Sequence, residues 1–374
     1  MLSCVVSERA AGQGADDLLS QLRDANSSVS IERWVVDAGG TPLLASDEWI
    51  FLARGAPDDP PHVVGDFNDG GYAAAPPFDD GRMQPLEGTD WFYLRTPVVN
   101  DARFEYLIRT SGGARRDPLN EAEATTFGTL RSVVTGSSTP SVAGKPSPEV
   151  KSFVFTSAER GNTRSVSVYL PEAYHKDGPP LPTLYVHDGS TFRDQVGIVN
   201  LIRIMTAMGR MPPVVTVLID PVNRGLEYGT AESYRRMFLN ELIPEVERRY
   251  STGGTPERRA ILGASRGALA ALDLVVGHPD VFSYGALVSP ALSPLPIVTR
   301  IETLAAIPAR FAVYPSRFDT PSLRADGRAL ATALTGRATG LKHRELPVDH
   351  SPHGWALWMD IVLEDLAHHL TQPR

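Results

Sequence analysis

The sequence predicts a two-domain protein, in which a β-sandwich precedes an α/β domain whose mostly parallel sheet is covered by helices on both faces. Three observations support this prediction. The chain has 374 residues, more than the roughly 100–200 of one typical domain. Short strand patterns separated by Gly, Pro and Asp fill its first part. In its second part, apolar strand patterns alternate with helix patterns.

Composition and charge exclude several function classes. The formal net charge is −8 and no long run of Lys or Arg occurs, so we do not expect a nucleic-acid partner. The single cysteine, Cys4, cannot form an internal disulfide, and no Cys/His cluster predicts a metal site or a cofactor. No stretch approaches the roughly 20 apolar residues of a membrane span, and the start lacks the apolar core of a secretory peptide. We therefore expect a cytoplasmic protein without a membrane partner, whose oligomeric state the sequence leaves unknown.

The N-terminal part is expected to contain a leader and the sandwich. Residues 1–28 form the leader, partly disordered or helical, with Leu18, Leu19 and Leu22 at helical spacing. Residues 29–134 form the sandwich, without a helix of useful length. Its expected strands are 49–54, 62–65, 91–95 and 103–108, and the last alternates apolar and other side chains as a strand with one buried face does.

The catalytic part is expected to begin after a linker. Residues 135–148 are rich in Ser, Thr, Gly and Pro, which is typical of an exposed linker, and residues 149–374 form the α/β domain. Its expected strands are 164–170, 182–187, 213–220, 259–262, 284–289, 310–314 and 344–348, and its expected helices are 195–208, 231–250 and 267–276.

The motif with the most specific chemistry is Gly263-Ala264-Ser265-Arg266-Gly267, which fits G-x-S-x-G between a predicted strand and a predicted helix. Glycines on either side of the serine permit the sharp turn that exposes a nucleophile above the sheet in an α/β-hydrolase fold. The helix N-terminus behind it favours negative charge. We therefore expect Ser265 to be a nucleophile.

In that fold the acid and then the histidine follow the serine along the chain. His353, in the loop before a terminal helix, is the expected base, with His350 as the alternative because loop position alone does not decide between them. Both could also be read as metal ligands, but no third ligand stands at supporting spacing. Asp319, after the strand that ends at residue 314, is the expected orienting acid, and a Ser–His dyad is the alternative.

An oxyanion hole needs two backbone amides aimed at the developing charge. One is expected from Arg266, and the other from Gly189 or Ser190 in the loop after strand 182–187. Arg224 lies at the same sheet edge and, with Arg266, would attract an anionic ligand. A salt bridge from Arg224 to Glu227 is the alternative interpretation.

These segments resemble the enterochelin esterase family. The similar segments of the catalytic half are 185–189, 220–228, 241–244, the serine turn, and His353-Gly354-Trp355-Ala356-Leu357-Trp358, which resembles the family's His-x-Trp-x-x-Trp segment and favours His353 over His350. Residues 88–93 and 116–120 resemble the family's early-set, immunoglobulin-like N-terminal domain. The resemblance implies a cytoplasmic serine esterase that cleaves the ester backbone of a catecholate siderophore such as enterobactin, with Asp188, Arg224 and Trp355 binding the substrate.

Two alternatives stay open. Arg266 and Ala268 depart from the residues usual in that family, and feruloyl and acetylxylan esterases with a glycogen-binding-like N-terminal module have a similar architecture. The chain could also keep the fold only to bind a ligand without catalysis. In each case the expected partner is a small molecule, an ester that is anionic or iron-loaded in the siderophore interpretation.

Overall fold

The computed structural model describes residues 13–25, 27–68, 81–140, 148–293 and 296–371, and the chain divides into two compact units. Unit 1 contains Met1–Pro140 and Pro347–Asp349, and unit 2 contains Ser141–Leu346 and His350–Arg374. The main division falls inside the segment 135–148 that the sequence predicts as a linker, of which residues 141–147 lie outside the described residues.

Unit 1 begins with two helices, α1 (Ala15–Asp24) and α2 (Ser28–Asp37). The helix that the spacing of Leu18, Leu19 and Leu22 predicts is present as α1. The expectation that no helix of useful length occurs in residues 29–134 is wrong, because α2 occupies the start of the predicted sandwich. The Ser27 side chain caps α2 by accepting a hydrogen bond from the Ser30 amide. Apolar residues of both helices are buried in one cluster with strand residues, so packing against a sheet stabilises these short helices.

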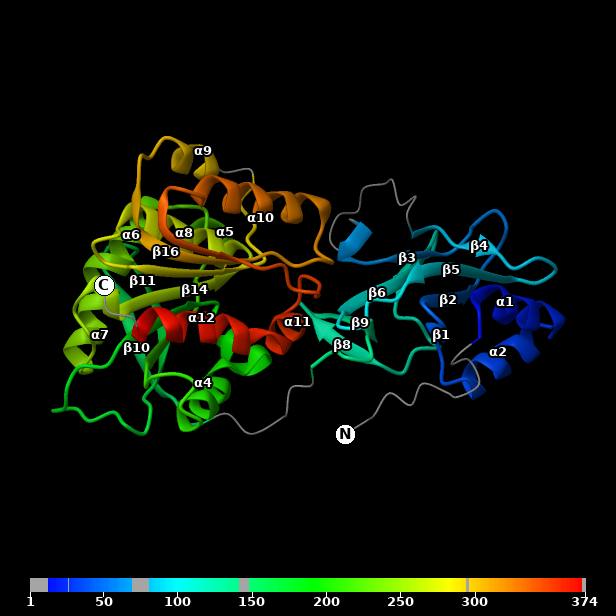
Figure 1. Ribbon diagram of the computed structural model, residues 1–374, viewed down its shortest axis with the longest axis horizontal. Helices are drawn as coiled ribbons and strands as arrows, with labels where there is room; N and C mark the ends of the chain where they lie inside the picture. The colour runs from blue at the N-terminus through cyan, green and yellow to red at the C-terminus, as the bar shows by residue number, and fades with distance from the viewer. Residues whose placement is uncertain (1–12, 26, 69–80, 141–147, 294–295, 372–374) are drawn as a thin grey trace. The chain divides into compact units, whose positions relative to one another are not determined.

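Two antiparallel sheets form the rest of unit 1 (Figure 1). Their strands run in the orders β1 (Leu43–Ala45), β2 (Glu48–Arg54), β5 (Trp91–Pro97), β4 (Gln84–Pro85) and β3 (His62–Val64), β6 (Arg103–Thr110), β9 (Thr129–Thr135), β8 (Glu123–Thr126), with β7 (Gly113–Arg115) on β6. Ile50 and Leu52 of β2 join the cluster with the helices, whereas the Phe51 ring meets the Tyr106 ring of the other sheet at 4.9 Å. Both faces of β2 are therefore buried, and unit 1 has three layers.

A short return of the chain completes unit 1. The Arg103 amide donates to the Pro347 carbonyl (3.1 Å), and the Asp349 amide donates to the Arg103 carbonyl (3.2 Å). The Asp349 carboxylate also accepts from the Glu105 amide (2.8 Å). The strand predicted at 344–348 is therefore wrong: this segment makes bridge contacts only, and the last strand lies before it.

Unit 2 is built on an eight-stranded sheet. Its strand order is β10 (Lys151–Ser157), β11 (Asn162–Tyr169), β13 (Val215–Ile219), β12 (Thr183–His187), β14 (Arg259–Ala264), β15 (Tyr284–Val288), β16 (Ile307–Tyr314), β17 (Ala338–His343). The pairs β10/β11 and β11/β13 are antiparallel, and every other pair is parallel. The mostly parallel sheet predicted for this half is thus present.

Helices cover both faces of this sheet, as predicted (Figure 1). One face carries α4 (Ile198–Ala207) and α12 (Met359–Thr371), and the other carries α6 (Glu232–Met237), α8 (Arg266–Gly277), α9 (Ile297–Glu302) and α10 (Pro321–Leu334). The remaining helical segments of unit 2 are α3 (Gly189–Thr191), η3 (Phe192–Val196), α5 (Arg224–Glu227), η4 (Phe238–Leu242), α7 (Ile243–Arg249), η5 (Pro256–Arg258) and α11 (Pro352–Leu357). Among the described residues, no helix is both long and apolar enough to cross a membrane.

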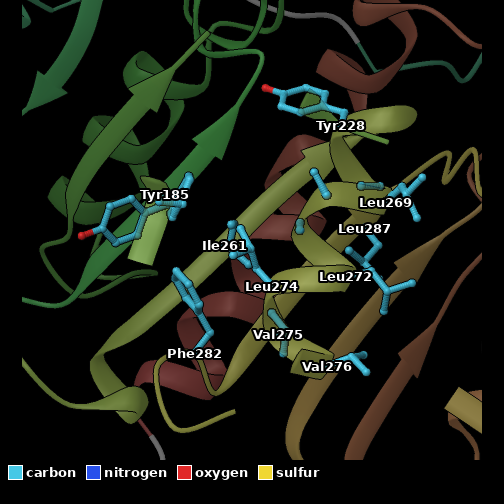
Figure 2. Close-up of a cluster of buried hydrophobic side chains, with 14 of the residues drawn as sticks. Tyr185, Tyr228, Ile261, Leu269, Leu272, Leu274, Val275, Val276, Phe282 and Leu287 are labelled. Carbon is cyan, nitrogen blue, oxygen red and sulfur yellow. The ribbon is translucent and has the colours of Figure 1, made fainter. Parts of the chain in front are cut away.

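Helix α8 is the centre of the unit 2 core. All its residues from 267 to 276 are buried. Figure 2 shows its leucines and valines packed beside Ile261 of β14 and Leu287 of β15, with Tyr228 near the end at which the helix begins. Burying each such side chain stabilises the fold by about 1.5–3 kcal/mol. The N-terminus of α8 is therefore held on a rigid base.

Candidate active site

Ser265 lies on the turn that joins β14 to α8. Its backbone has φ 55° and ψ −127°, a region that residues with a side chain rarely adopt. The amide of Ser265 donates to the Val288 carbonyl (2.9 Å), which ties the turn to the next strand. A Cβ on Gly263 would lie 2.2 Å from the Gly267 carbonyl oxygen, so only glycine permits this approach of strand and helix. The spacing of the motif thus has a direct steric cause.

The structure brings together a histidine and a carboxylate downstream of the serine. His350 Nδ1 lies 2.9 Å from Asp319 Oδ1 and 3.1 Å from Oδ2, and both side chains are buried. Asp319 lies in the loop between β16 and α10, where the sequence predicts the acid.

The expectation that His353 pairs with Asp319 is wrong, because His350 occupies that position. His350 precedes Ser351, whose side chain caps α11 by accepting from the Gly354 amide (3.0 Å). His353 lies inside the first turn of that helix, at a different angle about its axis. The local sequence therefore does not show which of His350 and His353 contacts Asp319, because the start of α11 between them sets their directions.

Trp355 supports His350 from α11. Its ring and the imidazole form a T-shaped pair, with the centroids 5.3 Å apart and an interplanar angle of 83°, and its Nε1 donates to Ser289 Oγ (3.0 Å). The indole also stacks on the Phe192 ring, with the centroids 6.4 Å apart. Only 3% of Trp355 is exposed, so its part in binding substrate stays a prediction that the structure does not support. Its contacts instead orient the imidazole.

Three successive amides follow strand β12, and neighbours occupy the outer two. The Asp188 amide donates to the Tyr228 hydroxyl (3.0 Å), and the Ser190 amide donates to Asp220 Oδ1 (3.0 Å). Ser190 therefore cannot supply the oxyanion-hole donor for which it was a candidate. In the part of the chain that the structure describes, the amides of Gly189 and Arg266 have no partner.

Arg224 forms a two-point ion pair at the same edge of the sheet. Its Nε and Nη2 donate to the Asp188 carboxylate at 2.9 and 2.8 Å. Burial raises the pKa of Asp188, although the Arg224 guanidinium opposes that shift. The alternative pair between Arg224 and Glu227 is wrong, because Glu227 binds Arg164 (2.7 Å). Among the described residues Arg224 Nη1 has no partner, and 43% of the side chain is exposed.

His187, at the end of β12, lies beneath the serine turn. It is fully buried, and its Nδ1 lies 3.0 Å from the Gly267 carbonyl oxygen, to which the ring donates as a neutral imidazole. Burial lowers the pKa of His187 to about 3. The sequence indicates only a histidine at the end of an apolar strand, because its partner is 80 residues away along the chain.

This burial makes the stability of the protein depend on pH. Below about pH 6.5 the unfolded chain binds a proton at His187, whereas the folded protein does so only near pH 3, so acid favours unfolding. From pH 7 to pH 5, we expect His187 to lower the free energy of unfolding by about 2 kcal/mol. Urea unfolding of wild type and His187→Asn at both pH values measures this contribution. An equal loss of stability in both proteins would contradict it.

The described residues contain no group of three His, Cys, Asp or Glu side chains arranged to hold a metal ion.

Comparison with known proteins adds the family. The Esterase family model, whose description is "Putative esterase", matches residues 157–360, more than half of the chain. This chain belongs to the Esterase family. The chain is 28% identical over 143 residues to the protein YbbA of Bacillus subtilis, and the match covers 34% of this chain and 56% of that protein. The chain is also 26% identical over 158 residues to an endo-1,4-beta-xylanase/feruloyl esterase of Xylanibacter ruminicola. That match covers 37% of this chain and 21% of that protein. The match thus spans about half the length of the first relative and a fifth of the second.

Solved structures share the fold of this chain. The enterobactin esterase of Shigella flexneri, crystallised in the presence of enterobactin, matches with a TM-score of 0.68 and 18% identity, covering 86% of this chain and 93% of that one. The ferric enterobactin esterase of Salmonella typhimurium matches with a TM-score of 0.65 and 19% identity, covering 84% and 94%. A ferulic acid esterase matches with a TM-score of 0.51 and 17% identity, covering 59% and 98%. The resemblance to enterochelin esterases predicted from the sequence is confirmed at the level of fold.

Proposed function

We propose that this protein is a serine esterase in which Ser265 attacks an ester carbonyl, His350 accepts and returns the proton, and Asp319 orients His350. The observation that carries the proposal is the buried pair of His350 and Asp319, in a chain that also holds a serine on a strained strand-to-helix turn. A strained serine alone could be structural. A histidine and an acid in the chain order of an α/β-hydrolase support a triad rather than a Ser–His dyad.

The protonation states follow from the geometry of the pair. Because Nδ1 of His350 faces the carboxylate, the neutral imidazole carries its proton on Nδ1, so Nε2 is the nitrogen that acts as the base. When His350 takes the serine proton, Asp319 stabilises the imidazolium. The amides of Gly189 and Arg266 stabilise the oxyanion of the tetrahedral intermediate. Water then hydrolyses the acyl-enzyme, with His350 as the base.

As substrate we propose the ester backbone of a catecholate siderophore. The likeness to the enterobactin esterase of Shigella flexneri covers 86% of the chain, a share that residues of unit 2 alone cannot provide, whereas the ferulic acid esterase covers 59%. Unit 1 would accordingly be an early-set domain. Arg224 Nη1 and the Arg266 side chain, which have no partners among the described residues, supply positive charge for an anionic, iron-loaded ligand.

A second candidate is a feruloyl or acetylxylan esterase. The 26% identity to the Xylanibacter ruminicola endo-1,4-beta-xylanase/feruloyl esterase supports it, because that match comes from sequence. A ligand-binding protein without catalysis is the third candidate, and the pair of His350 and Asp319 argues against it.

Chromatography of four reactions tests the proposal. Wild type is incubated with ferric enterobactin, iron-free enterobactin, methyl ferulate and acetylated xylan, each beside Ser265→Ala as control. Release of linear trimer or smaller fragments from enterobactin by wild type alone supports the siderophore substrate. Release of ferulate or acetate while enterobactin stays intact would overturn the siderophore as substrate and would support the proposed esterase activity. Equal products from both proteins, or none from any ester, overturn the serine mechanism.

A further inference from the structure

We infer that Tyr228 and His187 are positioning residues for the oxyanion hole. The Tyr228 hydroxyl accepts a hydrogen bond from the Asp188 amide, and the His187 ring donates one to the Gly267 carbonyl. The inference rests on the proposed function and concerns two side chains that do not touch the reacting atoms.

The first wall of the hole is the turn after β12. Asp188 has φ 52°, a left-handed conformation that breaks the strand and directs successive amides toward one side. The Tyr228 hydroxyl accepts from the first of these amides and Asp220 from the third, so Gly189 retains the middle amide for a ligand. Without the hydroxyl, the Asp188 amide would lose its buried partner, and the turn would lose one of the bonds that hold its strained conformation.

Glycine at position 189 also has a packing role. A Cβ there would lie 2.5 Å from the backbone nitrogen of Ile219, so the free amide is on a residue pressed against β13. The turn is therefore held on its β13 side by packing and at Asp188 by Tyr228.

The second wall is the start of α8. His187 holds the Gly267 carbonyl, and Gly267 directly follows Arg266, whose amide is the other donor. A Cβ on Gly267 would lie 3.0 Å from Asp188 Oδ2 and 3.6 Å from the Tyr228 ring, so the two walls meet at this glycine.

Tyr228 and His187 also contact each other. Their rings lie 4.8 Å apart, and both side chains are fully buried. One rigid pair therefore links the turn after β12 to the turn after β14. Each amide of an oxyanion hole contributes to the rate only when its direction matches the transition state. Loosening the contact between Tyr228 and His187 should raise the activation free energy of the chemical step without weakening binding of the substrate.

Tyr228→Phe is the decisive variant, because it removes one oxygen and keeps the ring. With p-nitrophenyl butyrate as substrate, we expect kcat to fall about 10-fold or more while KM changes less than about 2-fold. Affinity for a trifluoromethyl ketone, which forms a tetrahedral adduct with the serine, should fall by the same factor as kcat/KM. Tyr185→Phe is the matched control: it removes another buried hydroxyl, one without a partner among the described residues, and should leave kcat unchanged.

Two further variants separate positioning by His187 from packing. His187→Asn keeps an N–H donor near the position of Nδ1, whereas His187→Leu does not. Circular dichroism first checks that both variants are folded. We then expect His187→Asn to retain a larger fraction of the wild-type kcat than His187→Leu, at similar KM. Equal kcat values in these two variants would overturn the role of His187, and an unchanged kcat in Tyr228→Phe would overturn the role of Tyr228. If wild type itself hydrolyses no ester, the proposed function fails, and this inference fails with it.

Discussion

Replacing Ser265 by alanine is expected to lower kcat for ester hydrolysis by about 10⁵–10⁶-fold. Without Oγ no acyl-enzyme can form, and the pair of His350 and Asp319 then has no proton to accept. Measurement of p-nitrophenyl butyrate hydrolysis, with labelling by a fluorophosphonate probe in parallel, tests this expectation. Wild type should be labelled and Ser265→Ala should not.

The variant should remain folded, which makes the loss of activity interpretable. Alanine and serine experience similar strain at φ 55°, and the Ser265 hydroxyl has no hydrogen-bond partner among the described residues. Far-ultraviolet circular dichroism and the urea midpoint should therefore match those of wild type. Retained turnover in a folded, unlabelled Ser265→Ala protein would assign the chemistry to another residue.

Replacing His350 by glutamine is expected to lower kcat by about 10⁴–10⁶-fold, whereas His353→Gln should cost far less, about 10-fold or below. The difference follows from the Nδ1 contact with Asp319, which His350 makes and His353 does not. Glutamine retains polarity and much of the volume but cannot take up the serine proton. The two variants are measured side by side on one ester.

The pair of variants also decides between the two interpretations of this loop. If His353→Gln were the inactive variant and His350→Gln the active one, the assignment from the His-x-Trp-x-x-Trp resemblance would be restored. Equal and small losses of kcat in both variants would rule out either histidine as the catalytic base.

The strands of the unit 2 sheet could be predicted from the sequence wherever they are central. Strands β12 to β16 are mostly apolar and buried, so their patterns stand out. The two edge strands were missed. Most residues of β10 and β17 are exposed or half-buried, and such segments resemble loops in composition because only one neighbour pairs with them. The segment 344–348 makes only isolated bridge contacts, and its last two residues, 347 and 348, belong to the return of the chain to unit 1.

In unit 1 the prediction failed where helix and strand patterns compete. Ile31 and Val35 have the spacing of a helix, yet β-branched residues favour strands, so α2 was predicted as part of the sandwich. Both residues are buried in one cluster with residues of α1 and the sheet, and this packing stabilises the helix over a strand. That cluster joins segments far apart in sequence, which local patterns do not report.

The sequence by itself determined the turn that carries Ser265, because the steric demand at Gly263 comes from Gly267 and Ala268, a few residues further along the chain. It also indicated the loop after a central strand as the place of the acid, and Asp319 in that loop contacts His350. Only the tertiary structure decided that His350 pairs with Asp319, that Arg224 pairs with Asp188, and that the amide of Ser190 is occupied. These pairs join residues 30 or more positions apart, and their geometry depends on where two loops meet rather than on the composition of either.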